Sequence, residues 1–189
     1  LRLLIQFVCI YISLSCISLN QVDIPFKLSI LIAFGTWVYI TNITNFIDGT
    51  DGFLITHVIF FYTNILILNL IGFDQIFSFY LCFLILPSAI VFFFFNKPKA
   101  KLFMGDAGSI FFGFIIGFTF FEVLLSGHWN ISLSLMAYPF LDCTICLLKK
   151  IKRKIMPWVG IYDYYFLKPV INNKNNHKKV LIIFLAFNV

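Results

Sequence analysis

The run from Ile76 to Phe95 reads IFSFYLCFLILPSAIVFFFF and contains no charged side chain. At 1.5 Å per residue, about 20 helical residues cross the roughly 30 Å hydrocarbon core of a membrane. A spanning segment must satisfy its backbone hydrogen bonds internally, so this run predicts a transmembrane helix. A transmembrane barrel would need segments of about 10 residues with alternating polarity, and the sequence contains none.

The composition of the whole chain agrees with this prediction. Of its 189 residues, 61% are apolar and 12% are charged, whereas a soluble domain is about half apolar and a quarter charged. We therefore expect an all-α, polytopic transmembrane helix bundle that forms one domain over residues 1–189. Six full spans are expected, at Leu3–Leu19, Leu28–Ile43, Phe53–Ile71, Ile76–Phe95, Ser109–Leu125 and Ile131–Leu148.

The distribution of basic residues predicts the orientation of the bundle. With six spans, alternate loops share a side, and the loops 45–52, 96–108 and 149–179 together hold twelve of the fourteen Lys and Arg residues. The positive-inside bias makes these loops cytoplasmic, and 149–179 is expected to be a basic cytoplasmic loop. The net charge of +6 is thereby explained by topology and by attraction to anionic headgroups. Nucleic acid binding is not expected.

Acidic residues are the best markers of function in such a chain. A carboxylate at bilayer depth costs about 2.5–3.5 kcal/mol on insertion scales, so it usually faces an interior and serves a function. Three of the eight acids are expected near the external side, where water solvates them: Asp23, Asp74 and Glu122. The other five lie at or near cytoplasmic ends, which predicts a single cytoplasm-facing site: Asp48, Asp51, Asp106, Asp142 and Asp163.

The first polar cluster reads NITNFIDGTDG from Asn42 to Gly52. Asn42, Asn45 and Asp48 repeat every third residue, which puts them along one helical face before a glycine-containing turn. Asp51 then stands where it could accept hydrogen bonds from the amides at the start of the next helix. The alternative is a capped loop, which needs one Asp and one Gly but not this density of polar residues.

The second cluster reads FMGDAGS from Phe103 to Ser109 and follows three lysines in the stretch from Asn96 to Lys101. Its glycines allow the backbone to approach a ligand, and the helix that follows offers a positive end to phosphate. Asp106 could simply cap that helix, but capping leaves the glycines and lysines unexplained. A hard divalent cation would explain them, because Mg²⁺ commonly takes one or two carboxylates and fills its shell with water and phosphate oxygens.

The third polar feature is Asp142, in the sequence Pro-Phe-Leu-Asp inside the sixth expected span. Packing explains such a carboxylate poorly, although an ion pair with a Lys of the next loop is an alternative. The five basic residues between Lys149 and Lys154 either bind phosphate or fix topology, and topology is the favoured explanation.

Together, the patterns N-x-x-N-x-x-D-G-x-D-G, F-M-G-D-A-G-S and P-x-x-D resemble, in order and spacing, the motifs of the polyprenyl-phosphate N-acetylhexosamine-1-phosphate transferases (glycosyltransferase family 4). The resemblance extends from about Leu1 to Arg153. It implies a bacterial cytoplasmic-membrane enzyme of about ten or eleven helices. Such an enzyme transfers a sugar-1-phosphate from a UDP-N-acetylhexosamine to a polyprenyl phosphate and releases UMP, for cell-envelope polysaccharide or lipopolysaccharide synthesis. Ala107 makes the second motif more similar to the undecaprenyl-phosphate N-acetylglucosamine-1-phosphate branch.

The resemblance also implies roles for individual residues. The metal, Mg²⁺ or alternatively Mn²⁺, would be held by Asp106 and Asp48. The implied catalytic residues are Asp48, Asp51 and Asp106. The implied substrate-binding residues are Asn42, Asn45, Gly105, Gly108, Ser109, Lys101 and Asp142. A second copy of the chain, in a homodimer, is a further expected partner.

Two departures from the family pattern leave alternatives open. The family's paired aspartates have no counterpart here, and we expect them in a segment preceding Leu1. Its late His-rich motif is replaced by IYDYYFLKP at 161–169, for which Asp163 and His177 are weak substitutes. The alternatives are a transporter and a non-catalytic relative of the same fold. A CDP-alcohol phosphotransferase fits poorly, because it requires Asp-Gly-x-x-Ala-Arg. Covalent attack by an Asp and direct attack by the lipid phosphate both remain open.

Overall fold

The computed structural model of the chain describes residues 2–16, 26–72, 78–156, 165–168 and 177–188. All regular secondary structure in these ranges is helical, which confirms the expected all-α class. In chain order the elements are α1 (Arg2–Cys16), α2 (Phe26–Ile47), α3 (Phe53–Leu70), α4 (Ser78–Asn96), α5 (Gly105–Leu125), α6 (Trp129–Leu135), α7 (Ala137–Lys152), the 3₁₀ helix η2 (Tyr165–Leu167) and α9 (His177–Asn188).

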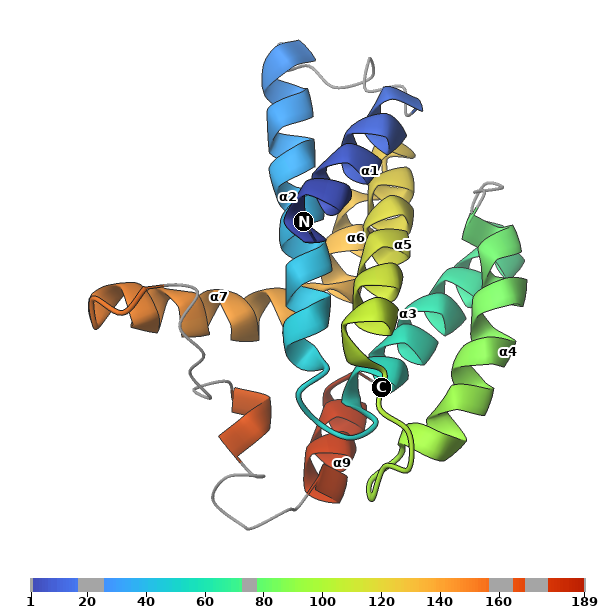
Figure 1. Cartoon of the computed structure of the whole chain (residues 1–189). Helices are drawn as coiled ribbons and strands as arrows, with labels where there is room; N and C mark the ends of the chain where they lie inside the picture. Colours follow the sequence, from blue (N-terminus) through green and yellow to red (C-terminus); the bar gives the residue numbers. More distant parts are fainter. Residues whose placement is uncertain (1, 17–25, 73–77, 157–164, 169–176, 189) are drawn as a thin grey trace.

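Helices α2 and α5 pair at the centre of the bundle, with α1 crossing them on one side and α3 and α4 packed together on the other (Figure 1). Large apolar side chains on the outer face of α4 are exposed, for example Phe83, Leu84 and Val91. Exposed apolar side chains are expected on a helix that faces lipid, because lipid tails are equally apolar. The fold is therefore that of a membrane-embedded bundle.

Among the described residues, four helices are long and apolar enough to cross a membrane: α2 over Leu28–Ile47, α3, α4 and α5. The count rises to five if α6 and α7 together form one bent span. The expected number of six full spans is thus slightly too high. The described part of α1 has 15 residues, which rise only about 22 Å at 1.5 Å each.

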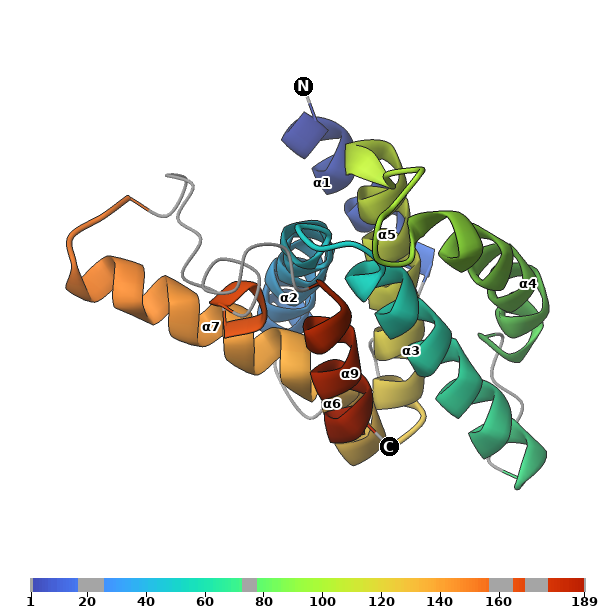
Figure 2. The same ribbon diagram turned by 90° about the horizontal axis from the view of Figure 1, so that it is seen from below.

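The sixth expected span, Ile131–Leu148, is broken. The chain bends by 64° between α6 and α7, at Met136. Helix α7 then lies across the direction of α2 and extends away from the bundle, as Figures 1 and 2 both show. The helix also continues to Lys152, so the expected basic loop at 149–179 begins inside a helix, and Lys150 is buried.

The end of α2 is the boundary that matters most for the candidate site. Its membrane span was expected to end at Ile43, and the helix continues for one further turn to Ile47. The helix therefore carries both Asn42 and Asn45, and Asp48 is the first residue beyond it. The connections from α2 to α3 and from α4 to α5 then lie at the same end of the bundle (Figure 1).

Candidate active site

The candidate site begins with an antiparallel contact between α2 and α5. A Cβ atom at Gly117 would lie 2.3 Å from Cδ1 of Trp37, and one at Gly113 would lie 2.9 Å from Cα of Thr41. The Trp37 indole N–H also donates a hydrogen bond to the Phe114 carbonyl at 3.0 Å. The absence of side chains at the two glycines therefore lets the helices approach closely, as small residues commonly do in membranes.

These contacts set a register that continues toward the end of α2. Each step of four residues forward on α2 corresponds to four residues back on α5, from Trp37 with Gly117 to Thr41 with Gly113. The next step places Asn45 beside Ser109, and their side chains form a hydrogen bond of 2.7 Å. The register thereby determines which polar side chains meet at the end of the bundle.

Asn45 joins the first two polar clusters of the sequence. Its side-chain amide donates to Oδ1 of Asp106 at 3.0 Å as well as to Oγ of Ser109. Ser109 in turn donates to the Gly105 carbonyl at 2.9 Å. The conformation of Gly105, with φ of +64°, starts α5 at this point and is one that glycine adopts without strain.

Asp48 is the first residue beyond α2, and its carboxylate lies close enough to that of Asp106 for their charges to interact. The pKa of Asp48 is raised to about 6: burial is the largest cause, a hydrogen bond from the Gly105 backbone N–H opposes it, and the negative charge of Asp106 adds to the rise. Asp48 is half-buried and Asp106 is exposed. Two adjacent carboxylates in such surroundings repel each other and attract a cation.

The pair fits a hard divalent cation. Within the part of the chain that the structure describes, no group of three or more His, Cys, Asp or Glu side chains could hold a metal ion. A cation held by Asp48 and Asp106 would complete its shell with water or substrate oxygens. That ligand set is the one Mg²⁺ commonly adopts when it binds phosphates.

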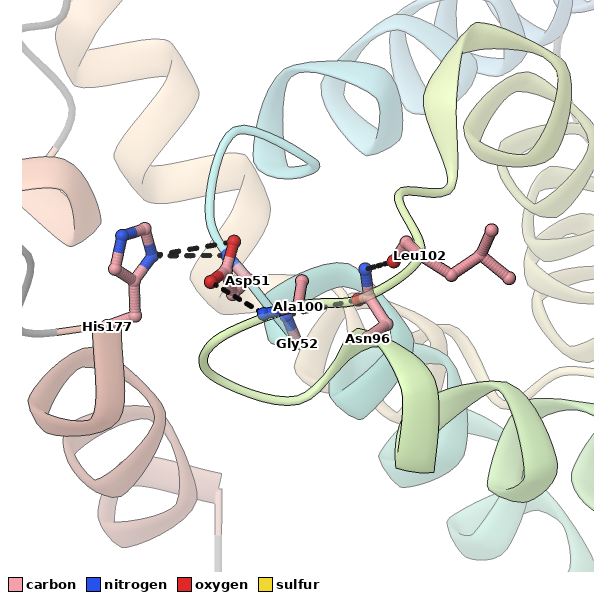
Figure 3. A network of polar contacts seen from close by, with 6 residues as sticks. All are labelled: Asp51, Gly52, Asn96, Ala100, Leu102 and His177. Carbon is pink, nitrogen blue, oxygen red and sulfur yellow. Dashed lines mark hydrogen bonds and ion pairs between the residues drawn. The ribbon is translucent and has the colours of Figure 1, made fainter.

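Asp51 lies in a neighbouring network, shown in Figure 3. Its Oδ2 accepts a hydrogen bond from the Ala100 backbone N–H at 3.2 Å, in the lysine-containing loop between α4 and α5. Asp51 was expected to accept from the first amides of α3, whereas its carboxylate accepts from the loop between α4 and α5. Instead, Gly52 adopts φ of +74° and turns the chain into α3, which aims Asp51 toward the other loop.

Asp142 makes a third, separate contact. Its side chain is 4% exposed, and Oδ1 accepts a hydrogen bond from the Tyr165 backbone N–H at 2.8 Å. It thus anchors η2 on α7. A Cβ at Gly49 would lie 3.9 Å from Cδ2 of Leu167, so η2 lies beside the turn that follows Asp48. Asp142 is linked to the site through η2.

Three further predicted site residues are Asn42, Lys101 and Gly108. The Asn42 side-chain amide donates to the Val38 carbonyl of its own helix at 2.8 Å. Lys101 is exposed beside the second cluster. Gly108 leaves room for Met104, whose Cγ would lie 2.5 Å from a Cβ there.

Two residues near Asp51 were not among the predicted site residues. Nδ1 of His177 accepts a hydrogen bond from the Asp51 backbone N–H at 3.3 Å, although the sequence suggested only a weak substitute for a missing motif. Asn96 was expected only to mark the start of a loop, but its Oδ1 accepts a hydrogen bond from the Gly52 backbone N–H at 3.1 Å. Asn96 carries a signal, because it is the polar residue that ends a run of four phenylalanines. His177 carries none, because 126 residues separate it from Asp51.

Comparison with known proteins supports the resemblance. Residues 1–124 match the family described as glycosyl transferase family 4. The chain belongs to this family. The match covers α1 to α5 and thus both carboxylates of the pair, whereas η2 and α9 lie beyond it.

Individual relatives are more distant. The chain is 29% identical over 158 residues to a phospho-N-acetylmuramoyl-pentapeptide-transferase of Buchnera aphidicola subsp. Baizongia pistaciae, covering 73% of this chain and 45% of the relative. It is 29% identical over 129 residues to a probable undecaprenyl-phosphate N-acetylglucosaminyl 1-phosphate transferase of Bacillus subtilis, covering 62% of this chain and 34% of the relative. The chain therefore spans between a third and a half of the length of these relatives. No solved structure matches it significantly.

Proposed function

We propose that the protein transfers a sugar-1-phosphate from a UDP-N-acetylhexosamine to a polyprenyl phosphate in the membrane, releasing UMP. The observation that carries the proposal is the pair of carboxylates, Asp48 and Asp106, that α2 and α5 bring together beside a loop with three lysines. A carboxylate pair suits a divalent cation, and a cation beside lysines suits a substrate with several phosphate charges.

In the proposed reaction, an oxygen of the polyprenyl phosphate forms a bond to the phosphorus that carries the sugar. The bond from that phosphorus to the bridging oxygen breaks, and UMP leaves with the electron pair. When bound, Mg²⁺ supplies charge neutralisation at the transferred phosphoryl group. Lys101 and the positive N-terminal end of α5 attract the diphosphate, while Asn45 holds the Asp106 carboxylate in place.

The names of the relatives support the two substrate classes. The Bacillus subtilis relative is named for undecaprenyl phosphate and for an N-acetylglucosaminyl 1-phosphate group, and the Buchnera relative for phospho-N-acetylmuramoyl-pentapeptide. Since Ala107 in the second motif favours the first branch, we propose UDP-N-acetylglucosamine as the donor to be tested first. The proposed setting is the inner leaflet of a bacterial cytoplasmic membrane, in cell-envelope polysaccharide synthesis. The site would face the cytoplasm, and a homodimer is the proposed assembly.

The test is Mg²⁺-dependent release of UMP by membranes that contain the protein, given UDP-N-acetylglucosamine and undecaprenyl phosphate. Asp106→Asn keeps the size of the side chain and removes its charge, so we expect UMP release to fall by about a hundredfold or more. Asp74→Asn is the matched control, because the charge pattern predicts an external loop for Asp74. Near-normal turnover by Asp106→Asn would refute the assigned role.

The same membranes can be used to distinguish a transferase from a transporter. Ion-driven flux into vesicles that does not depend on any UDP-sugar would favour a transporter over a transferase. A wild-type protein that binds the donor and releases no UMP would favour the non-catalytic relative.

A further inference from the structure

Helix α9 packs against the turn that carries Asp51. The Phe184 ring lies 4.7 Å from the Phe53 ring and 5.5 Å from the Tyr138 ring, measured between centroids. A Cβ at Gly52 would lie 3.1 Å from Cδ1 of Leu181. These apolar contacts fix the first turn of α9 beside the start of α3, although the two are more than 120 residues apart in sequence.

This packing brings the His177 ring to the Asp51 backbone. Nδ1 accepts a hydrogen bond from the Asp51 N–H at 3.3 Å and lies 3.8 Å from Oδ1 of the same residue. To accept from an amide, Nδ1 must carry a lone pair, so this hydrogen bond requires the tautomer with its hydrogen on Nε2. In that tautomer the contact is a backbone hydrogen bond that positions Asp51.

A second side chain holds the next amide from the other side of the turn. Oδ1 of Asn96 accepts from the Gly52 N–H at 3.1 Å, and Nδ2 of Asn96 donates to the Leu102 carbonyl at 2.8 Å. Asn96 is 3% exposed, so these hydrogen bonds compensate for the loss of water. Two consecutive amides, those of Asp51 and Gly52, are thus held by α9 and by the end of α4 (Figure 3).

The arrangement determines where the Asp51 side chain points. With both amides held, Oδ2 of Asp51 accepts a hydrogen bond from the Ala100 N–H. This bond connects the turn to the loop that contains Lys97, Lys99 and Lys101. Without His177, the partly buried Asp51 N–H loses its acceptor, and the turn is held at Gly52 by Asn96 but no longer at Asp51 by α9. The carboxylate and the lysine loop would then lose their common alignment.

We propose that His177 is a positioning residue, which acts through the Asp51 backbone amide to align the Asp51 carboxylate and the lysine loop with the reacting diphosphate. The role in the reaction rests on the proposed function. It assigns a part in the site to α9, which lies outside the region that matches the family.

Three substitutions test the role of the acceptor atom. In His177→Asn the amide oxygen occupies the position of Nδ1, whereas in His177→Gln it reaches the position of Nε2, and His177→Ala has no acceptor. We expect kcat for UMP release to fall about 10- to 100-fold in the Ala and Gln variants, with the KM of each substrate within about threefold of wild type. The Asn variant is expected to retain kcat within about threefold. Lys178→Ala, an exposed side chain on the same helical turn, is the matched control.

Amide hydrogen exchange of the segment 48–56 supplies a readout that does not need activity. We expect faster exchange in the Ala and Gln variants and wild-type exchange in the Asn and Lys178→Ala variants. Wild-type kcat in His177→Ala, or equal losses in the Asn and Ala variants, would overturn the inference. So would unchanged exchange in His177→Ala. If the wild-type protein releases no UMP, the proposed function fails, and exchange alone decides whether His177 holds the turn.

Discussion

The Asn45 side chain connects α2 to the start of α5. It donates to both Asp106 and Ser109, so its loss removes a hydrogen bond that orients the Asp106 carboxylate. We expect Asn45→Ala to lower Mg²⁺-dependent UMP release by about tenfold or more, the usual effect of removing a group that orients a metal ligand. Asn64→Ala is the control, because the Asn64 side chain donates to the Phe60 carbonyl one turn back in its own helix. Equal activities of the two variants would contradict this role.

At the residue scale, the sequence predicts the members of the carboxylate pair and Asn45, but not the contacts of Asp51 and Asp142. Asn45, Asp48 and Asp106 stand out because polar residues are rare and costly near a membrane. The contacts of Asp51 and Asp142 could not be predicted in the same way. These contacts depend on where α9 and η2 pack against the bundle, and the local spacing of residues does not predict that packing.

The contact between α2 and α5 requires glycine at the point of closest approach. A methyl group at Gly117 would overlap the fully buried Trp37 ring, so Gly117→Ala forces the helices apart. We expect a loss of about 1–3 kcal/mol in stability, seen as a thermal midpoint lowered by several degrees in detergent, together with reduced UMP release.

Gly35→Ala is the matched control for this substitution, because a Cβ at Gly35 in α2 meets nothing within 4 Å. There, alanine should leave stability unchanged or raise it by up to about 1 kcal/mol, since glycine is the poorer helix former. A Gly117→Ala protein as stable and active as wild type would show that the two helices do not need this approach.

At the element scale, four of the expected spans correspond to α2 to α5, but α2 ends four residues later than expected, at Ile47, and α5 begins four residues earlier, at Gly105. The break between α6 and α7 was not predicted, although Pro139 stands three residues after the bend at Met136. Apolar content alone does not distinguish a straight span from a bent one. The register between α2 and α5 could not be predicted either, because the sequence contains several glycines that could have faced a neighbouring helix.

The orientation of the whole molecule is a separate prediction. Twelve of the fourteen basic residues lie in three segments that the sequence predicts to share one side. Two of these segments contain the connections 48–52 and 97–104, which lie at the same end of the bundle (Figure 1). A protein whose five native cysteines are replaced by alanine allows each side to be labelled separately. We expect Lys97→Cys to react only when a membrane-impermeant thiol reagent reaches the cytoplasmic side, and Ser126→Cys only from the external side. The opposite pattern would contradict the cytoplasmic location of the site.

The central claim is that α2 and α5 bring Asp48 and Asp106 together to hold one divalent cation. Binding of Mn²⁺ to the purified protein, monitored as the loss of the electron paramagnetic resonance signal of the free ion, tests this claim directly. We predict one tight site in the wild type, loss of that site in both Asp48→Asn and Asp106→Asn, and wild-type affinity within about threefold in Asp51→Asn, whose carboxylate bonds to the Ala100 amide instead. Full-affinity binding in either of the first two variants would contradict the account.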